Sequence, residues 1–434
     1  MISVFTPLAA SGNSYIQAAY DSLVAQTVTD WEWIVVENHG GMLPKKIRKD
    51  PRVKLSGINL EGIGALKRHC CTLATGEYLF EFDHDDLLHP QALEKALLAF
   101  DQGADFVFSD TAEFQDKTWA PNVYGTQFGW SSYPVTFQGH ELLAQPNPPV
   151  TAHNLRLIDF APNHFRAFRR DAYWSVGGHN ADLHVGDDHD LMLKFFLAGL
   201  TFRHVPECLY FYRVHDKQTT NANVGNARIR QVTESLYDQH IFDLAEKFTR
   251  DYSVILPLKK IDLCGGIDTY KDYTPLDQTL GHNLDEIWPL EGESVGVIRA
   301  FDAIEHLKDP IHTLNEAYRV LAPGGFFLIQ VPSTTGPMIR APAMDGGEFH
   351  WVASAGRGAH QDPTHVSFWN ENSFWYYTKQ SHARYIPRSQ AKFQVIKMRT
   401  FYPSAWHMQR AIPYVEAHLI ALKDGYRPMG LVEI

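Results

Sequence analysis

The chain has 434 residues, and its 39 lysines and arginines against 50 aspartates and glutamates give a formal charge of −11. This acidic balance argues against bulk nucleic-acid binding, because binding to phosphates needs a basic surface. Hydrophobic residues at 44% and charged residues at 21% are typical of a globular protein and not of disorder or coiled coil. No apolar run is long enough for a membrane span, and Met1 leads into a strand-like segment without a basic leader. We therefore expect a soluble, cytoplasmic protein without a membrane span.

The four cysteines are Cys70, Cys71, Cys208 and Cys264. Two are sequence neighbours, none belongs to a C-x-x-C pair, and their spacing matches no zinc site. We expect free thiols in a reducing compartment.

The first hundred residues alternate strand and helix patterns. Apolar runs at 2–5, 33–36 and 78–82 predict buried strands, and apolar residues at helical spacing predict helices around 16–23 and 93–100. Strands that alternate with helices are typical of a mainly parallel sheet covered on both faces.

From residue 112 to 165 this alternation breaks down. The segment is rich in aromatic residues, proline, asparagine and glutamine, which predicts a long loop region that is either functional or mobile. A polar helix around 226–250 follows as a connector. A second α/β series begins at 261–263, and its clearest unit is a helix at 311–321 that Pro-Gly-Gly separates from a strand at 326–331.

The clearest chemical signal is the run Asp83-His84-Asp85-Asp86 after the strand predicted at 78–82. Three carboxylates within four residues repel one another unless they are solvated or bind a cation. Hard cations such as Mg²⁺ and Mn²⁺ prefer oxygen ligands and often keep phosphate oxygens in their shell. The carboxyl end of a strand is also where open α/β sheets bind ligands. A metal site is one interpretation, and a solvated acidic turn before the next helix is the other.

The surrounding sequence resembles the inverting family-two glycosyltransferases of the GT-A fold. The segments that carry the resemblance are 2–7, 22–27, 31–36 and 76–86, and it covers the first half of the chain in order and spacing. It implies transfer of a sugar from a nucleotide-sugar, with a UDP-sugar as the favoured donor, to an acceptor hydroxyl. It also implies a Mn²⁺ or Mg²⁺ cofactor and inversion at the anomeric carbon.

The resemblance assigns nucleotide-sugar contacts to Pro7, Glu37, Asn38, Lys67 and Arg68. The family usually has two aspartates where this chain has Glu37 and Asn38, and this departure leaves the choice of nucleotide open. Lys67 and Arg68 fall where the family has an Arg-Asn pair near the nucleotide. A cationic side chain there would favour binding of a phosphate group, and a solvated helix face is the alternative.

The resemblance assigns metal binding to Asp83 and Asp85, which match the D-x-D motif of the family. Asp83 also counts as a nucleotide-sugar contact, and Asp85 is expected to bridge the ion to the diphosphate. His215 ends a Tyr-Arg-x-His motif and is expected to bind the metal or the diphosphate. A structural histidine is the alternative.

Asp188 receives the catalytic role. It lies in the segment Gly-Asp-Asp-His-Asp-Leu at 186–191, where the family has a Glu-Asp pair whose second acid is the general base. One carboxylate near the acceptor hydroxyl can take its proton as the oxygen attacks the anomeric carbon. The alternative is that Asp187 and Asp188 only favour a helix N-terminus by their charge.

The second half resembles the class I S-adenosylmethionine-dependent methyltransferases. The segments that carry this resemblance are 261–266, 301–307, 315–325 and Asp-Pro-Thr-His at 362–365. A glycine-rich turn after a strand lets the backbone approach a cofactor, and an acid at the end of the next strand can hold ribose hydroxyls.

On this resemblance Asp262, Gly265 and Gly266 line the S-adenosylmethionine site, and Asp277 binds the ribose of the cofactor. Cys264 replaces the first glycine of the Gly-x-Gly motif of the family, and a side chain there crowds the cofactor. Active methyl transfer and a retained scaffold both remain interpretations.

The sequence thus predicts an α/β protein with two domains. A GT-A nucleotide-sugar-binding domain over 1–222 is joined by a helical linker over 223–254 to a Rossmann-like methyltransferase domain over 255–434. The leading hypothesis is a glycosyltransferase whose C-terminal domain methylates the product. One alternative is a glycosyltransferase with an inactive methyltransferase-like domain that binds the acceptor or forms a homo-oligomer. The other is a non-enzymatic carbohydrate-binding protein.

Overall fold

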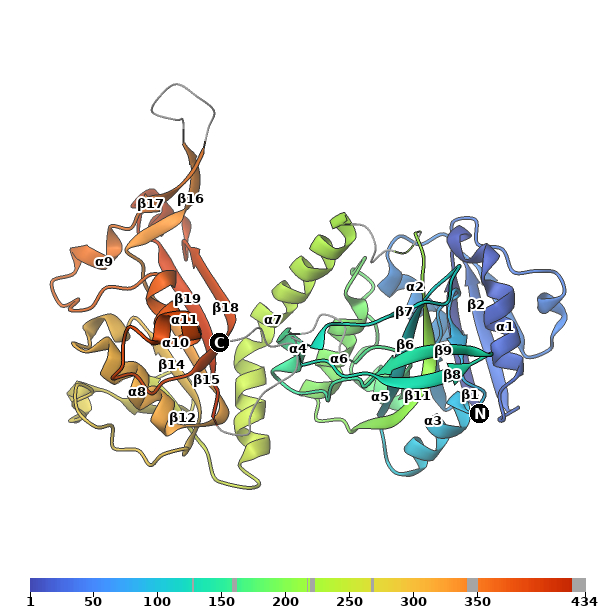
Figure 1. Ribbon diagram of the computed structural model, residues 1–434, viewed down its shortest axis with the longest axis horizontal. Coiled ribbons are helices and arrows are strands. Elements are labelled where there is room, and N and C mark those ends of the chain that lie inside the picture. The colour runs from blue at the N-terminus through green and yellow to red at the C-terminus, as the bar shows by residue number, and fades with distance from the viewer. Residues whose placement is uncertain are drawn as a thin grey trace. The chain divides into compact units, whose positions relative to one another are not determined.

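The computed structural model describes residues 1–126, 129–157, 162–216, 218, 223–266, 269–341 and 350–423. The chain divides into two compact units, Met1–Ile241 and Phe242–Ile434, and each contains its own large sheet (Figure 1). The predicted α/β architecture with two domains is confirmed. Helix α7 (Asn223–Tyr252) contributes residues to both units, so the division between them falls inside the segment predicted as a linker.

The N-terminal unit is built on an eleven-stranded sheet. Its strands are β1 (Ile2–Leu8), β2 (Trp31–Glu37), β3 (Val53–Gly57), β4 (Tyr78–Glu81), β5 (Leu87–Leu88), β6 (Phe106–Gln115), β7 (Pro121–Asn122), β8 (Tyr133–Phe137), β9 (His140–Gln145), β10 (Arg166–Arg169) and β11 (Phe202–Val214). Its helices besides α7 are α1 (Ile16–Val24), α2 (Ile63–Leu73), α3 (Ala92–Asp101), α4 (Asn154–Leu157), α5 (Arg170–Ser175) and α6 (Asp187–Leu197), with short 3-10 helices at Ala10–Ser14 and Ile47–Lys49.

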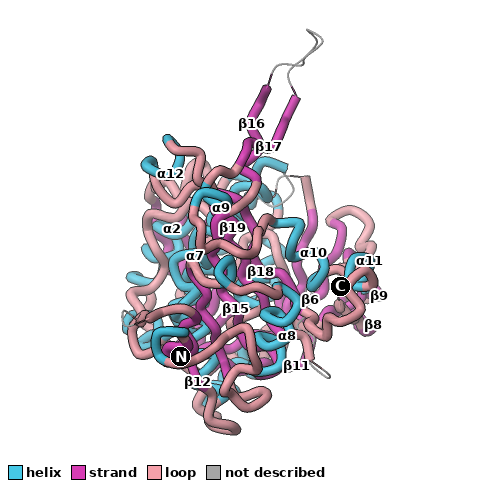
Figure 2. Tube along the Cα trace, turned by 90° about the vertical axis from the view of Figure 1, so that its left-hand side faces the viewer, coloured by secondary structure: helices cyan, strands magenta, loops and turns pink. Residues whose placement is uncertain are grey.

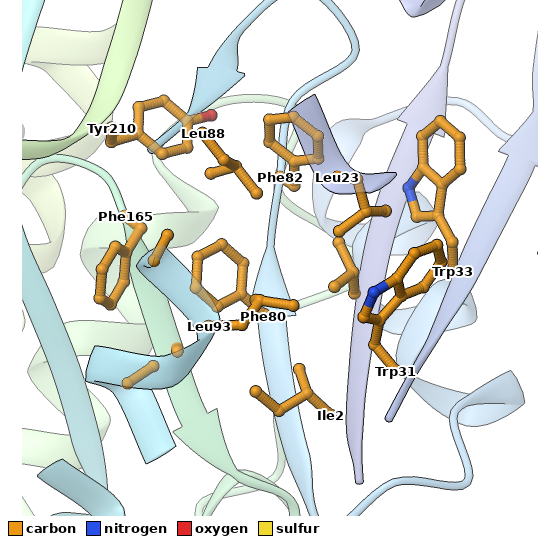
Figure 3. Packing of buried hydrophobic residues seen from close by; sticks show 14 of the residues in the cluster. Ile2, Leu23, Trp31, Trp33, Phe80, Phe82, Leu88, Leu93, Phe165 and Tyr210 are labelled. Carbon is orange, nitrogen blue, oxygen red and sulfur yellow. The ribbon is translucent and has the colours of Figure 1, made fainter. Parts of the chain in front are cut away.

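Four neighbouring strands of this sheet, in the order β3-β2-β1-β4, run parallel, so their carboxyl ends share one edge. All seven residues of β1 are buried, as expected for a continuous apolar strand covered on both faces. Helix α1 places Ile16 and Leu23 in the same core as the strand residue Phe80. Figure 3 shows Phe80 and Phe82 packed in this core together with Trp33.

The C-terminal unit has a six-stranded sheet and a two-stranded ribbon. Its strands are β12 (Lys259–Leu263), β13 (Thr274–Leu276), β14 (Val295–Phe301), β15 (Leu321–Pro332), β16 (Thr335–Ala341), β17 (His350–Ala355), β18 (Phe393–Phe401) and β19 (Tyr414–Ala421). Its helices are α8 (Pro310–Val320), α9 (Gly358–Gln361), α10 (Trp375–Thr378), α11 (Gln380–Ala383) and α12 (Ala405–Gln409), with 3-10 helices η5 (Gln278–Leu280), η6 (Ile304–His306) and η7 (Glu371–Phe374).

The strands of the six-stranded sheet follow the order β13-β12-β14-β15-β19-β18. Strands β13, β12, β14 and β15 are parallel, and β19 runs antiparallel to both of its neighbours. The ribbon of β16 and β17 extends away from this sheet (Figure 2).

The segment from 112 to 165 differs from its expectation as a loop region. It contains the end of β6 and the hairpin of β8 and β9, which pairs with β6. Pro134 inside β8 weakens the strand signal in the sequence, because proline cannot donate to a strand ladder. The turn of the hairpin holds Gln138 and Gly139 at φ +48° and +81°.

All four cysteines are free thiols, as expected. Among the described helices, none combines the length and the apolar character that crossing a bilayer requires.

Candidate functional site

The acidic run 83–86 lies directly after β4, at the carboxyl edge that β4 shares with β1. His84 Nδ1 lies 2.9 Å from the carbonyl oxygen of Pro7, the penultimate residue of β1. Because a carbonyl oxygen only accepts, Nδ1 must donate this hydrogen bond. A side chain at Gly12 would collide with the His84 ring. Pro7 therefore fixes the acidic run through its backbone carbonyl.

Asp86 has a structural role in this run. It is fully buried, and its carboxylate accepts hydrogen bonds of 2.8 Å from the Tyr210 hydroxyl and from the backbone N–H of Arg213. Burial raises the pKa of Asp86 well above its usual value, and the charges of Asp85 and Asp83 act in the same direction. Asp86 thus ties the run to β11.

Asp85 and His215 are brought together. Asp85 Oδ2 lies 2.8 Å from His215 Nε2, and Tyr15 stacks on the His215 ring with centroids 4.8 Å apart. Burial by itself raises the pKa of Asp85, but the hydrogen bond with His215 and the charge of His84 outweigh it and leave the pKa below its usual value. Asp85 is therefore ionised at neutral pH, as a metal ligand must be.

Asp83 is the more exposed of the two aspartates predicted as metal ligands, with 31% of its side chain accessible against 14% for Asp85. Its Oδ2 lies 3.4 Å from His164 Nε2, which in turn lies 2.9 Å from the Arg166 guanidinium. A guanidinium only donates, so His164 Nε2 accepts from Arg166 and cannot donate to Asp83. Burial raises the pKa of Asp83 to about 6, and the charges of Glu81 and Asp85 act in the same direction.

Two cations and three carboxylates form a connected network behind this edge. Lys67 Nζ lies 2.8 Å from Glu81 and 3.1 Å from Asp187, and the Arg166 guanidinium lies 3.0 Å from Glu81 and 2.8 Å from Asp188. Charges that are shielded from water interact strongly, and here only Asp188 is substantially accessible. Lys67, which the resemblance assigns to the nucleotide, therefore pairs with two buried carboxylates.

Asp188 lies in the first turn of α6, beside Asp187. The accessible fraction of its side chain is 24%, against 4% for Asp187. Burial by itself raises the pKa of Asp188, but Arg166 and Lys67 outweigh it and lower the pKa to about 2. For Asp187, burial dominates and raises the pKa to about 6. Asp188 is thus ionised at neutral pH and accessible to a bound hydroxyl.

An open hollow of about 400 Å³ lies at the carboxyl ends of β2 and β3. This volume falls in the range of about 300–1,000 Å³ that is typical of small-molecule sites. The residues that line it are Glu37, Asn38, His39, Gly40, Gly41, Gly57, Ile58 and Asn59. The structure thus brings both predicted nucleoside-binding residues to one concave surface.

The side chains of Glu37 and Asn38 are held by the protein itself. Glu37 Oε1 accepts hydrogen bonds of 2.6 Å from Arg48 and 2.5 Å from the backbone N–H of Leu43. The amide of Asn38 exchanges two hydrogen bonds with the backbone of Leu60. These two side chains fix the shape of the hollow.

Arg68 holds the turn after α5. Its guanidinium donates to the carbonyl oxygens of Gly177 and His179 and lies 5.3 Å from the centroid of the Trp174 ring. Gly177 and Gly178 have φ values of +83° and +65°, which glycine adopts without strain. The structure places Arg68 on this turn.

In the C-terminal unit, the predicted cofactor turn follows β12. Asp262 is fully buried, pairs with Arg299 at 2.9 Å and accepts a hydrogen bond of 2.9 Å from the backbone N–H of Tyr270. A side chain at Gly265 would collide with the Asp262 carboxylate. Asp262 and Gly265 therefore stabilise the turn from inside.

Cys264 and Gly266 give the turn its backbone shape, with φ values of +55° and +54°. Cys264 thus keeps the left-handed conformation that glycine favours. A side chain at Gly266 would meet no atom of the described residues within 4 Å, and the backbone N–H of Gly266 donates to Asp277 at 3.2 Å. Asp277 Oδ1 also accepts from the N–H and the hydroxyl of Thr279. Gly266 and Asp277 therefore lie together.

Sequence reasoning missed Glu81, Arg166 and His164. Glu81 is an acid inside a buried apolar strand, and that position is a usable signal for a paired charge. Arg166 and His164 carry no comparable pattern, because their proximity to the acidic run depends on the antiparallel pairing of β10 with β4.

The predicted ligands Asp83, Asp85 and His215 do not form one compact group. Among the residues that the structure describes, two groups bring their ligand atoms within 4.8 Å of one another: Glu81 with Asp83 and His164, and a second group in the C-terminal unit. The two cations beside Glu81 would repel a metal ion in the first group. Asp83 and Asp85 are two positions apart in the sequence, and their carboxylates are partly accessible. They match the oxygen preference of a hard cation better than the group with Glu81 does.

Comparison with known proteins finds two family models that match separate parts of the chain. Residues 3–177 match "Glycosyl transferase family 2", and residues 239–381 match "Methyltransferase domain". The chain is 23% identical over 297 residues to the O-antigen biosynthesis protein RfbC of Myxococcus xanthus, covering 65% of this chain and 22% of that protein. It is 26% identical over 250 residues to a chondroitin synthase of Pasteurella multocida, covering 56% and 24%.

A further match is shorter. Over 51 residues the chain is 47% identical to a probable S-adenosylmethionine-dependent methyltransferase of Mycolicibacterium smegmatis, covering 12% of this chain and 20% of that protein. The chain spans less than a quarter of the length of each of these three relatives.

Proposed function

We propose that the chain is a metal-dependent inverting glycosyltransferase whose C-terminal unit methylates the product. The matches of residues 3–177 to a family 2 glycosyltransferase model and of residues 239–381 to a methyltransferase domain model support this proposal. The donor is a nucleotide-sugar, with a UDP-sugar favoured, and the acceptor supplies a hydroxyl group. Two relatives are named for chondroitin synthesis and O-antigen biosynthesis, which supports a glycan as the acceptor.

The observation that carries this proposal is that the hollow and the acidic run lie at one edge of the sheet. Strands β3, β2, β1 and β4 are neighbours and parallel. The hollow follows β2 and β3, and Asp83 and Asp85 follow β4. A nucleoside in the hollow therefore directs its diphosphate along this edge toward the two aspartates.

The aspartates suit a divalent cation. Both are partly accessible, Asp85 is ionised at neutral pH, and the raised pKa of Asp83 reflects burial and repulsion by neighbouring acids that a cation would offset. Asp83 and Asp85 would hold Mn²⁺ or Mg²⁺, with His215 orienting Asp85. When bound, such an ion neutralises the charge of the leaving diphosphate.

Asp188 supplies the base. The acceptor oxygen attacks the anomeric carbon, the bond from that carbon to the phosphate oxygen breaks, and the nucleoside diphosphate leaves with the electron pair. The hydroxyl proton passes to the Asp188 carboxylate, and the single displacement inverts the anomeric centre. Arg166 keeps Asp188 ionised and lowers its proton affinity, so proton transfer follows bond formation, when the hydroxyl has become acidic.

The test compares turnover of a panel of UDP-sugars with Mn²⁺ in the wild type, Asp188→Asn and Asp182→Asn. Asp182 is an exposed residue in the loop before α6 and serves as the matched control. We expect Asp188→Asn to lower kcat by about 10²–10⁴-fold with little change in UDP affinity, and Asp182→Asn to behave as the wild type. Equal turnover in all three proteins would remove Asp188 from the catalytic role.

For the C-terminal unit, the open space beside Gly266 and its bond to Asp277 support binding of S-adenosylmethionine. The side chain at Cys264 favours the alternative of an inactive scaffold. A thermal shift with S-adenosylhomocysteine separates the two, because a ligand that binds only the folded state raises the Tm. A raised Tm supports the cofactor site, and an unchanged Tm at millimolar ligand supports the scaffold.

A further inference from the structure

Two segments that carry the methyltransferase resemblance, but have no role so far, meet just beyond the carboxyl end of β14. Glu305 and His306 end η6, and His365 lies in the Asp-Pro-Thr-His segment that follows α9. The backbone N–H groups of Val366 and Ser367 donate hydrogen bonds of 2.8 and 3.0 Å to the carbonyl oxygen of Glu305. The two segments are therefore fixed to each other by their backbones.

Three side-chain atoms converge in this place. Glu305 Oε1 lies 4.0 Å from His306 Nε2 and 3.9 Å from His365 Nε2, and the ligand atoms of the three residues all lie within 4.8 Å of one another. Two ligands of one ion with bonds of about 2.1 Å are roughly 3.0–3.4 Å apart. Small side-chain rotations therefore suffice to place all three atoms around one ion.

The hydrogen bonds of the two imidazoles leave the right nitrogens for a metal. His365 Nδ1 lies 3.1 Å from the carbonyl oxygen of Ala359, and His306 Nδ1 lies 3.3 Å from the carbonyl oxygen of Thr364. Because carbonyl oxygens only accept, both Nδ1 atoms donate, and in the neutral rings both Nε2 atoms carry lone pairs. Backbone carbonyls orient metal-binding histidines in this same way.

Glu305 gives an independent indication. The residue is 2% exposed, and among the described residues neither of its carboxylate oxygens has a hydrogen-bond partner. Burying a carboxylate without a partner is costly, so such groups are paired or bind a metal. A neutral imidazole whose Nε2 carries a lone pair cannot donate to it.

We propose that Glu305, His306 and His365 form a binding site for a divalent transition-metal ion. Two imidazole nitrogens and one carboxylate favour such an ion over Mg²⁺ or Ca²⁺, which prefer oxygen ligands. Asp362 Oδ2 lies 4.0 Å from His365 Nε2 and can serve as a further ligand.

The site leaves coordination positions open on its accessible side, where 34% of the His306 side chain and 46% of the Asp362 side chain are exposed. Strand β14 is a parallel neighbour of β12, so this site shares a sheet edge with the turn of Gly265 and Gly266. The open positions suit hydroxyl oxygens of the methyl acceptor, a role that rests on the proposed methyl transfer.

The test is a Co²⁺ titration of the full chain followed by visible d–d absorption, with no methyl donor or acceptor present. The protein carries Asp83→Asn and Asp85→Asn, so that the N-terminal acids do not contribute. His365→Ala, His306→Ala and Glu305→Gln are compared with His360→Ala, which removes an exposed histidine of the adjoining helix α9 whose ring lies 4.7 Å from that of Phe368.

We expect the parent protein to bind one Co²⁺ per chain, with d–d absorption bands typical of nitrogen and oxygen ligands. The Kd for Co²⁺ should be more than ~100-fold higher in each of the three site variants. His360→Ala should bind as the parent does. Absence of binding in the parent, or unchanged binding in His365→Ala and His306→Ala, overturns the proposal. Circular dichroism verifies that each variant is folded, so that loss of binding reports on the site; His306→Ala alters the most accessible of the three side chains and is the variant expected to disturb the fold least. The absorption readout does not depend on methyl transfer. If the protein proves to have no methyltransferase activity, the result on metal binding still holds.

Discussion

At the scale of single residues, Glu32 shows how one buried carboxylate joins three segments. It lies on β2 and is 4% exposed. Its carboxylate accepts hydrogen bonds of 2.5 Å from the Ser3 hydroxyl and 2.6 Å from the backbone N–H of Thr75, and it pairs with Lys54. Burial by itself raises the pKa of Glu32, but these contacts outweigh it and lower the pKa from 4.5 to about 2.

We expect Glu32→Gln to lower the free energy of unfolding at pH 7 by about 2–3 kcal/mol. The pKa of the folded state lies below that of the unfolded state, so the stabilisation is present above pH 4.5 and is lost as the pH falls toward 2. Urea unfolding at pH 7 and pH 3 measures this, with Glu77→Gln as an exposed control. An equal loss at both pH values would contradict the assignment.

The sequence also shows what can be predicted about the site at this scale. Asp83, Asp85 and Asp188 stand out because clustered acids need a physical reason. Arg166 does not, because its role comes from β10 pairing antiparallel with β4, a contact across 85 positions of the chain. The contacts of Lys67 depend in the same way on where α6 packs.

At the scale of elements, the apolar strands and amphipathic helices of both units were predictable, because each buries a regular pattern of side chains. The hairpin of β8 and β9 was not, since its strand contains Pro134 and its Gln138-Gly139 turn carries no strong signal. The turn after α5 contains the glycine pair Gly177-Gly178, and the collision that a side chain at Gly178 would make depends on where Tyr173 packs.

Gly177 and Gly178 provide a matched pair of substitutions in this turn. Both have positive φ, but within the described part of the chain a side chain at Gly177 would meet no atom within 4 Å, whereas one at Gly178 would lie 2.6 Å from the Tyr173 ring. We expect Gly177→Ala to cost about 1 kcal/mol from backbone strain and Gly178→Ala about 1–3 kcal/mol more from the collision. Urea unfolding of the two variants provides the comparison, and equal losses would show that the ring moves aside freely.

At the scale of the whole molecule, each unit has its own hydrophobic core. Phe80 belongs to a core formed by residues of the N-terminal unit, and Phe327 belongs to a core formed by residues of the C-terminal unit. The sequence predicted this division from two successive α/β series with different motifs. The division between the two units falls inside α7, within the segment 223–254 that the sequence predicts as a helical linker.

Separate cores predict two thermal transitions in calorimetry of the full chain. Phe327→Ala removes a fully buried ring and should lower the Tm of the C-terminal transition, at a cost of about 3–5 kcal/mol. The N-terminal transition, identified as the one whose Tm rises when UDP is added, should keep its Tm. Phe80→Ala should do the reverse. A single transition that both substitutions lower equally would contradict the independence of the two cores.

The most direct test of the account is calorimetric titration of UDP into the full chain with Mn²⁺ and with EDTA, for the wild type, Asp85→Asn and Asp21→Asn. Asp21 is exposed on α1 and serves as the control. We predict that Mn²⁺ strengthens UDP binding at least ~10-fold in the wild type and in Asp21→Asn, and that Asp85→Asn removes this dependence. UDP binding that is the same with Mn²⁺ and with EDTA, or a Mn²⁺ dependence that Asp85→Asn leaves intact, would contradict a metal-assisted nucleotide-sugar site at the carboxyl edge of β4.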